Sequence, residues 1–152
     1  MTFPYGVHYA AVEIDIETGR VDIHRYCVAY DVGRAINPVL VEGQIVGGVA
    51  QGIGGTLLEE LSYNDDGQLV SASFMDYLLP TAAEVPHVDV LVTEDAPTSR
   101  NPLGAKGAGE GGAAAVGAAL ANAVSDALGV EVTRLPLSPD RIVTLAASGG
   151  DT

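Results

Sequence analysis

The chain has 152 residues, enough to close one hydrophobic core without disulfides or a structural metal. Its formal net charge of −13, from 20 acidic and 7 basic residues, disfavours contact with phosphate backbones and predicts no nucleic-acid partner. A single cysteine excludes an internal disulfide and a cysteine-based metal site, which fits a reducing cytoplasm. Without the pattern of a signal peptide or a membrane-spanning helix, a cytoplasmic protein with no membrane span is expected.

The first part of the chain has the pattern of a β-hairpin over residues 7–30. Apolar and acidic residues alternate from Val12 to Glu17, as in a strand with one face in water. Thr18-Gly19 supplies a turn, and a second strand follows over Arg20–Tyr30. The alternation slips between Ile23 and Tyr26, which predicts a bulge or a stretch buried on both faces.

A long glycine-rich helix is predicted next. Asn37 is a favourable cap, Pro38 suits the first helical position, and no proline interrupts Val39–Leu61. Each interior glycine costs up to about 1 kcal/mol relative to alanine, so the glycines spaced by four, at 43/47 and 48/52, indicate a close approach. We favour packing against another backbone over contact with a flat ligand.

The rest of the chain mixes short strands, one long loop and a helix of small residues. Strands are predicted at Gln68–Phe74, 88–92 and Val130–Leu135. Residues 95–109 form a loop of a length that is usually functional or mobile. Glu110–Leu128 is almost entirely Ala, Gly, Val and Leu, which predicts a buried helix that ends at Gly129.

Ser138-Pro139 begins a short terminal helix. Strands and helices mix without strict alternation, so we predict an α+β fold with a mixed sheet. The domain spans residues 1–148, and 149–152 form a disordered tail.

The loop ends in a glycine-rich run, 106–112, at the start of the small-residue helix. Gly107, Gly109 and Gly112 match the dinucleotide pattern G-x-G-x-x-G, but no hydrophobic strand precedes them, so a nicotinamide or flavin site is disfavoured. The N–H groups of the turn favour an anion or a negatively charged cofactor edge. Glu110 is suited to proton transfer, although an acidic residue there also stabilises a first helical turn.

His8, His24 and His87 lie on separate predicted strands without metal-ligand spacing, so we expect no metal cluster and no special role for them. Cys27 is predicted to be a small buried hydrophobic residue.

Five sequence motifs follow one another along the chain: Asp31–Pro38, Val41–Gly54, Phe74–Tyr77, Asn101–Glu110 and Pro136–Arg141. In this order they resemble the xanthine dehydrogenase and aldehyde oxidase family, and look closest to its carbon monoxide dehydrogenase large-subunit branch. The resemblance spans residues 5–143.

The resemblance implies that the chain is the carboxyl-terminal part of a molybdopterin-binding subunit. Glu110 would be the catalytic base beside molybdenum, taking a proton from a metal-bound hydroxyl. Gln44 would contact the pterin, and molybdenum would be held by the pterin dithiolene rather than by protein ligands. The other residues on the cofactor side would be Lys106, Gly107, Ala108 and Gly109.

The resemblance also implies partners. Molybdopterin, with the cytosine dinucleotide form as one option, would be shared with the rest of a longer molybdenum subunit, and FAD and 2Fe-2S clusters would lie in partner subunits. We expect the isolated chain to be inactive and to self-associate through surfaces that the missing partner covers. The alternative is a non-catalytic assembly module derived from this domain. The substrate is left open.

Overall fold

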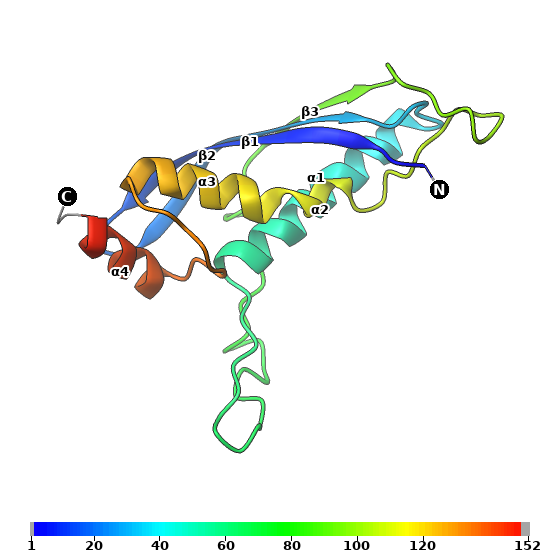
Figure 1. The fold of residues 1–152 in the computed structure, drawn as a ribbon. Helices are drawn as coiled ribbons and strands as arrows, with labels where there is room; N and C mark the ends of the chain where they lie inside the picture. The colour runs from blue at the N-terminus through cyan, green and yellow to red at the C-terminus, as the bar shows by residue number, and fades with distance from the viewer. Residues whose placement is uncertain (1, 150–152) are drawn as a thin grey trace.

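In the computed structural model, which describes residues 2–149, helices cover one face of a three-stranded sheet (Figure 1). The strands are β1 (Tyr5–Asp15), β2 (Arg20–Asp31) and β3 (Val88–Thr93). The central strand β2 pairs antiparallel with β1 and parallel with β3. The helices are α1 (Pro38–Leu57), α2 (Gly111–Ala114), α3 (Val116–Leu128) and α4 (Pro139–Gly149). This mixed sheet with helices confirms the predicted α+β class.

The β1–β2 hairpin confirms the predicted one, including its irregularity. Ala11 pairs with Arg25 whereas Val12 pairs with Ile23, so His24 is an extra residue in β2. Because side chains alternate between the faces of a strand, the extra residue changes which parity faces inward. Beyond the bulge the even-numbered residues of β2 face the helices, and before it the odd-numbered ones do. The bulge therefore keeps one continuous apolar face.

The core lies between this face and the helices. Three apolar residues spaced by four on α1 and three on α3 are fully buried, which is the spacing of a single helix face. They pack against the inward side chains of β2. These buried residues are Ile45, Val49 and Ile53 of α1, Val116, Leu120 and Val124 of α3, and Tyr26, Val28 and Tyr30 of β2.

The start of α1 and one of its glycine rows confirm the sequence interpretation. The Asn37 side chain accepts a hydrogen bond from the N–H of Leu40, as expected of a cap. A Cβ on Gly48 would lie 2.9 Å from main-chain atoms of α2, and one on Gly52 would lie 2.5 Å from the Val116 side chain. The glycines of this row therefore allow α1 to pack closely against α2 and α3. The row at 43 and 47 faces open space instead.

The predicted extent of α1 was wrong by one turn. The helix ends at Leu57 rather than Leu61, because the Gly54 carbonyl accepts from the N–H groups of both Leu58 and Glu59. Beyond the helix end, the Glu59 carboxylate accepts a hydrogen bond from the Tyr77 hydroxyl.

The segment 58–87 leaves α1, projects away from the sheet as an arm and returns to β3, where Val85 packs against the core (Figure 1). The predicted strand at Gln68–Phe74 was wrong, since this segment pairs back on the arm through one bridge, Tyr63 with Leu69, and does not join the sheet. The arm carries highly exposed apolar side chains, with Phe74 80% and Met75 89% exposed.

The carboxyl-terminal third also differs from expectation in two places. The small-residue helix is interrupted at Ala115 and buries only one face, so it is not buried all round. The predicted strand at Val130–Leu135 was wrong, because the N–H groups of Val130 and Val132 donate to the main chain and the hydroxyl of Ser125 rather than to a strand edge. The C-cap at Gly129, with φ of 67°, is confirmed.

The terminal helix α4 is confirmed and ends at Gly149, the first residue of the predicted tail. Residues 150–152 of that tail lie outside the described residues. Within residues 2–149, no helix combines the length and apolar character needed to cross a membrane.

The two glycine rows of α1 should respond oppositely to added methyl groups. Gly48→Ala is expected to lower the free energy of unfolding by about 1–3 kcal/mol, because the new methyl overpacks the contact with α2. Gly47→Ala faces open space and should raise it by up to about 1 kcal/mol through better helix propensity. Urea unfolding of both variants measures the difference, and shifts of the same sign would contradict the assigned packing.

Candidate cofactor-facing site

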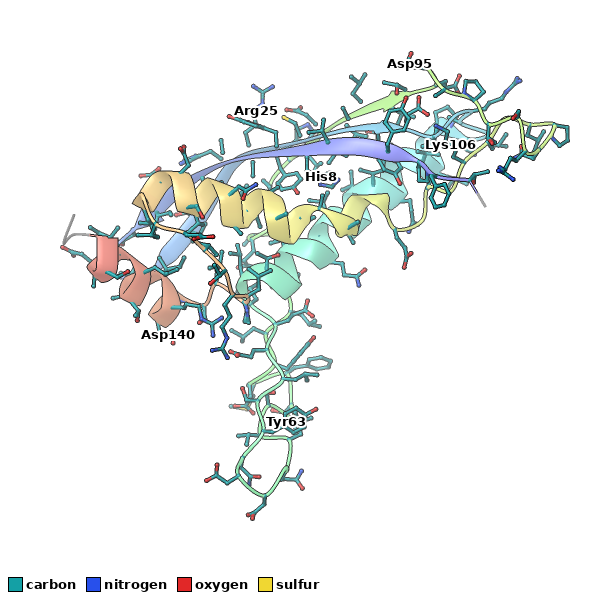
Figure 2. All side chains as sticks on the ribbon, viewed as in Figure 1. His8, Arg25, Tyr63, Asp95, Lys106 and Asp140 are labelled. Atoms are coloured by element: carbon teal, nitrogen blue, oxygen red, sulfur yellow. The ribbon has the colours of Figure 1, made fainter. Side chains whose placement is uncertain are left out.

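The glycine-rich turn, residues 106–112, lies where β1 begins and beside the first half of α1, with Lys106 at that end of the molecule (Figure 2). Segments from four parts of the chain meet there. They are the start of β1, the end of β2, the start of α1 and the loop after β3.

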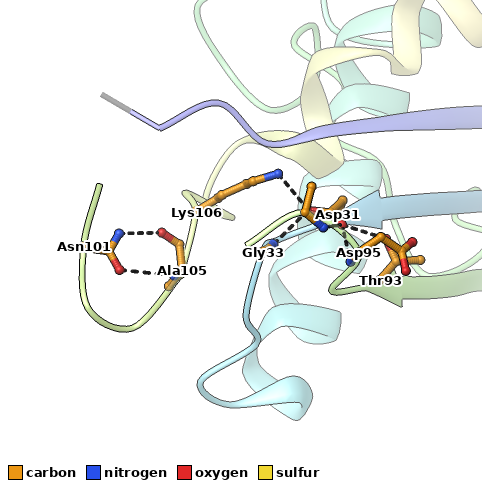
Figure 3. A network of polar contacts seen from close by, with 8 residues as sticks. Asp31, Gly33, Thr93, Asp95, Asn101, Ala105 and Lys106 are labelled. Carbon is orange, nitrogen blue, oxygen red and sulfur yellow. Dashed lines mark hydrogen bonds and ion pairs between the residues drawn. The ribbon is translucent and has the colours of Figure 1, made fainter. Parts of the chain in front are cut away.

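The anchor of this region is the buried carboxylate of Asp31, at the end of β2 (Figure 3). The Lys106 ammonium lies 2.8 Å from one Asp31 oxygen, and the two side chains are 7% and 1% exposed. The same ammonium lies 4.6 Å from the centre of the Tyr5 ring, a cation–π contact. The other donors to the carboxylate are the N–H groups of Gly33, Asp95 and Ala96 and the hydroxyl of Thr93.

This environment keeps Asp31 ionised. The Lys106 ammonium lowers the pKa of the Asp31 carboxyl most strongly, and the N–H groups of Gly33, Ala96 and Asp95 lower it further, while burial acts in the opposite direction. The only lysine of the chain therefore binds the loop to the sheet from inside.

The first half of the turn is fixed on α1. Gln44 donates from its side-chain nitrogen to the carbonyl of Gly109 over 2.8 Å, across 65 positions of sequence. Two residues that the sequence placed on the cofactor side are thus brought into direct contact. Within the turn, the N–H of Lys106 donates to the Val32 carbonyl.

The second half of the turn is fixed by β1 and β2. The His8 ring bonds the carbonyl of Gly111 through Nε2, at 3.1 Å. A Cβ on Gly111 would lie 2.1 Å from the Tyr30 ring, and one on Gly112 would lie 2.2 Å from the carbonyl oxygen of Ile45 in α1. Only glycine fits at these two positions.

Glu110 lies between the two fixed halves. Its carbonyl accepts from the N–H groups of Ala113 and Ala114, whereas its side chain makes no capping hydrogen bond and is exposed. The Glu110 carboxylate therefore does not cap the first turn by a hydrogen bond, although its charge still lies at the N-terminus of α2. The arrangement is a free carboxylate on a fixed main chain.

The surface around Glu110 is suited to a flat, polar cofactor. A Cβ on Gly107 or Gly109 would meet no atom within 4 Å, and the same holds for Gly43 and Gly47 on the adjoining helix. A ligand can therefore approach the main chain closely on both sides of Gln44, as molybdopterin would require. These residues fit the cofactor that the motifs imply.

Sequence reasoning missed the supports of the turn. Asp31, Tyr5 and His8 contact it across large sequence separations, which no local pattern encodes. One signal was available, because His8 and Tyr26 share the inward parity of the hairpin once its bulge is placed. The lone position of Lys106 also pointed to a specific partner.

The remaining singled-out residues lie on the surface. His24 pairs with Glu13, and His87 lies 3.6 Å from Asp89. Cys27 is half-buried and donates weakly to Asp89, so it is not the fully buried residue expected. Across residues 2–149, no group of three or more His, Cys, Asp or Glu side chains could hold a metal ion.

Comparison with known proteins gives the class of this domain. The model of the molybdopterin cofactor-binding domain matches residues 1–86. The gamma subunit of the 6-hydroxypseudooxynicotine dehydrogenase complex of Paenarthrobacter nicotinovorans is 51% identical over 144 residues, covering 93% of this chain and 18% of that subunit. The carbon monoxide dehydrogenase large chain of Afipia carboxidovorans is 38% identical over 129 residues, covering 84% and 16%.

Solved structures agree with this class. Carbon monoxide dehydrogenase from Oligotropha carboxidovorans matches with a TM-score of 0.91 and 33% identity, over 99% of this chain and 19% of that chain. Quinoline 2-oxidoreductase from Pseudomonas putida 86 matches with a TM-score of 0.88 and 42% identity, over 93% and 18%. The chain therefore belongs to the molybdopterin cofactor-binding domain family of the molybdenum hydroxylases, as its motifs predicted. It spans less than a fifth of the length of these relatives.

The Asp31–Lys106 pair should make stability depend on pH. The folded-state pKa of Asp31 lies below the unfolded value of about 3.9, so its contribution is complete above that pH and is lost as the pH falls further. Asp31→Asn should therefore be much less stable than the parent at pH 7, with a gap that narrows below about pH 4. Urea unfolding at pH 7 and pH 3 measures the gap.

Asp22→Asn is the matched control, because Asp22 forms an exposed ion pair with Arg20. It should change stability little at either pH, as exposed ion pairs contribute little. A gap for Asp31→Asn that stays constant with pH would contradict the assigned role of the carboxylate.

Proposed function

We propose that Glu110 is the catalytic base of a molybdenum hydroxylase active site and that Gln44 and the turn Lys106–Gly109 form part of its cofactor surface. One observation supports this most. The carbonyl groups of Gly109, Glu110 and Gly111 are each hydrogen-bonded, while the Glu110 carboxylate between them is exposed and makes no capping bond. A base needs such a combination of fixed position and available lone pairs.

The molybdenum cofactor, when bound, supplies the oxygen-transfer and two-electron chemistry. The residues of this chain supply position and a proton acceptor. Glu110 takes a proton at a carboxylate oxygen from the group that attacks the substrate and later releases it to solvent. The loss of a proton in the transition state makes the attacking group a stronger nucleophile.

Gln44 has hydrogen-bonding capacity left for a pterin edge. One N–H of its amide is used by Gly109, which leaves the second N–H and the amide oxygen. A donor and an acceptor side by side match the alternating donors and acceptors of a pterin ring. The side chain is exposed on the same helix face as the open glycines 43 and 47.

Lys106 would act on cofactor binding indirectly, without a direct contact to a phosphate or carbonyl group of the cofactor. Its ammonium is held between Asp31 and the Tyr5 ring, so its effect on cofactor binding is to position Gly107, Ala108 and Gly109. Because Gly107 and Gly109 have no side chain, the cofactor can come close to the main chain of this segment.

We further propose that the rest of a molybdenum subunit completes this site. The sheet face without helices carries an apolar row, in which Val7 pairs with Ala29 and Ala29 pairs with Leu91. Val7 and Leu91 are 64% and 61% exposed. Such surfaces mark an interface that is not covered here. Family membership extends the proposal to the cytosine dinucleotide form of the cofactor and to FAD and 2Fe-2S partner subunits.

Glu110→Gln tests the catalytic role in the complex that carries molybdenum and pterin. The amide has similar size but cannot accept the proton, so kcat is expected to fall by about 10²–10⁴-fold while the molybdenum and pterin content stays the same. Glu131→Gln, an exposed acid beyond the end of α3, is the control and should leave both values unchanged. Unchanged turnover in Glu110→Gln would support a non-catalytic assembly module instead.

The isolated chain is expected to self-associate through its uncovered apolar surfaces. Light scattering over a concentration series should show an increasing average mass. Replacing Phe74 and Met75 together by serine should reduce the increase, whereas Gln68→Ser on the same arm should not. A monomer at every concentration would contradict this prediction.

A further inference from the structure

Glu110 is flanked by glycine on both sides, so the main chain next to it has unusual conformational freedom. Gly109 and Gly111 have no Cβ to restrict their φ and ψ angles, so the peptide planes next to Glu110 are free unless contacts fix them. Gln44 fixes the Gly109 carbonyl from α1. The corresponding contact on the other side comes from β1, through His8.

His8 lies on the helix-facing side of β1, between the sheet and the helices (Figure 2). Its Nε2 lies 3.1 Å from the Gly111 carbonyl oxygen, and its Nδ1 lies 2.9 Å from the Tyr26 hydroxyl. The two rings meet edge to face, with centroids 5.8 Å apart and an interplanar angle of 86°. Both ends of the imidazole are therefore engaged.

The partners determine the tautomer. A carbonyl oxygen only accepts, so Nε2 must carry the hydrogen and donate it to Gly111. In a neutral imidazole Nδ1 then accepts, and the Tyr26 hydroxyl donates to it. Burial lowers the pKa of His8, although its bond to Gly111 acts in the opposite direction, and burial raises the pKa of Tyr26. Both shifts favour the neutral pair.

We infer that His8 is a positioning residue which, held by Tyr26, fixes the Gly111 carbonyl and so the main-chain direction from which Glu110 presents its carboxylate. The inference rests on the proposed function of Glu110. Tyr26 is fully buried on the central strand β2, so His8 is oriented by a residue that the core itself holds in place. The Tyr30 ring also packs directly against Gly111, where an added Cβ would lie 2.1 Å from it.

The inference is tested in the full chain by amide hydrogen exchange measured with NMR. The N–H groups of Ala113 and Ala114 donate to the Glu110 carbonyl, so they report on the turn. His8→Phe removes both ring bonds and should accelerate their exchange by about tenfold, the factor expected for one lost hydrogen bond. The Val28 amide in the centre of the sheet should change far less.

The conservative variant distinguishes positioning from simple packing. In His8→Gln the amide nitrogen can donate to Gly111 and the amide oxygen can accept from Tyr26, so exchange at Ala113 and Ala114 should return towards the parent value. His24→Phe, which removes an exposed imidazole from the same hairpin, should leave these amides unchanged. Uniform acceleration across the sheet, or no rescue by glutamine, would overturn the inference.

The tautomer of His8 gives a second test that needs no variant. Long-range proton–nitrogen NMR of the chain at pH 7 should show a neutral ring with the hydrogen on Nε2. A ring protonated on Nδ1, or on both nitrogens, would overturn the inference even if His8→Phe does not fold.

Failure of this inference differs from failure of the proposed function. If Glu110→Gln retains turnover in the cofactor-loaded complex, the catalytic role fails while the exchange and tautomer results stand. If Glu110→Gln abolishes turnover but His8→Phe leaves Ala113 and Ala114 unaffected, only the positioning role fails.

Discussion

The region around Glu110 depends on one buried ion pair. Asp31 ends the central strand, Lys106 begins the glycine-rich turn, and the carboxylate also gathers N–H groups from the segment after β3. A buried carboxylate of this kind is stable only with all its acceptor sites engaged, so the loop must take the path that delivers those donors. The position of the turn is therefore a consequence of satisfying a single charge.

Glycine has two opposite effects in this fold. At 48, 52 and 112 it permits helices and turns to approach more closely than any side chain would allow. At 109 and 111 it makes the main chain beside Glu110 flexible, and side chains from α1 and β1 remove that flexibility by bonding the carbonyl groups. The main chain of the turn is thus accessible to a ligand and still held in one conformation.

Local patterns predicted the parts of the fold that local forces decide. The hairpin, its bulge, the cap of α1 and the C-cap at Gly129 follow from alternation and from the chemistry of single residues. The end of α1 was missed because its C-cap is Leu58, a residue type that does not mark the end of a helix in sequence. Residues that favour strands predicted strands at 68–74 and 130–135. Among residues 2–149, however, neither segment pairs with a strand of the sheet.

In the candidate site, too, motifs predicted some of the residues and left out others. Motifs predicted that Glu110, Gln44 and 106–109 share a surface, and the structure brings Gln44 to Gly109. The supports, Asp31 and His8, act across 75 and 103 positions and could not be read from neighbours in sequence.

The projecting arm has an energetic consequence of its own. Its order rests on a few main-chain bonds near water, such as those from the N–H of Val70 to the Ser62 carbonyl and from the N–H of Asn64 to the Gln68 carbonyl. The apolar side chains near its tip lie outside the core. Local opening of the arm therefore exposes little new apolar surface and is nearly independent of global unfolding. The turn at the tip, Asn64–Gln68, can therefore change in sequence while the sheet and its helices keep the same shape.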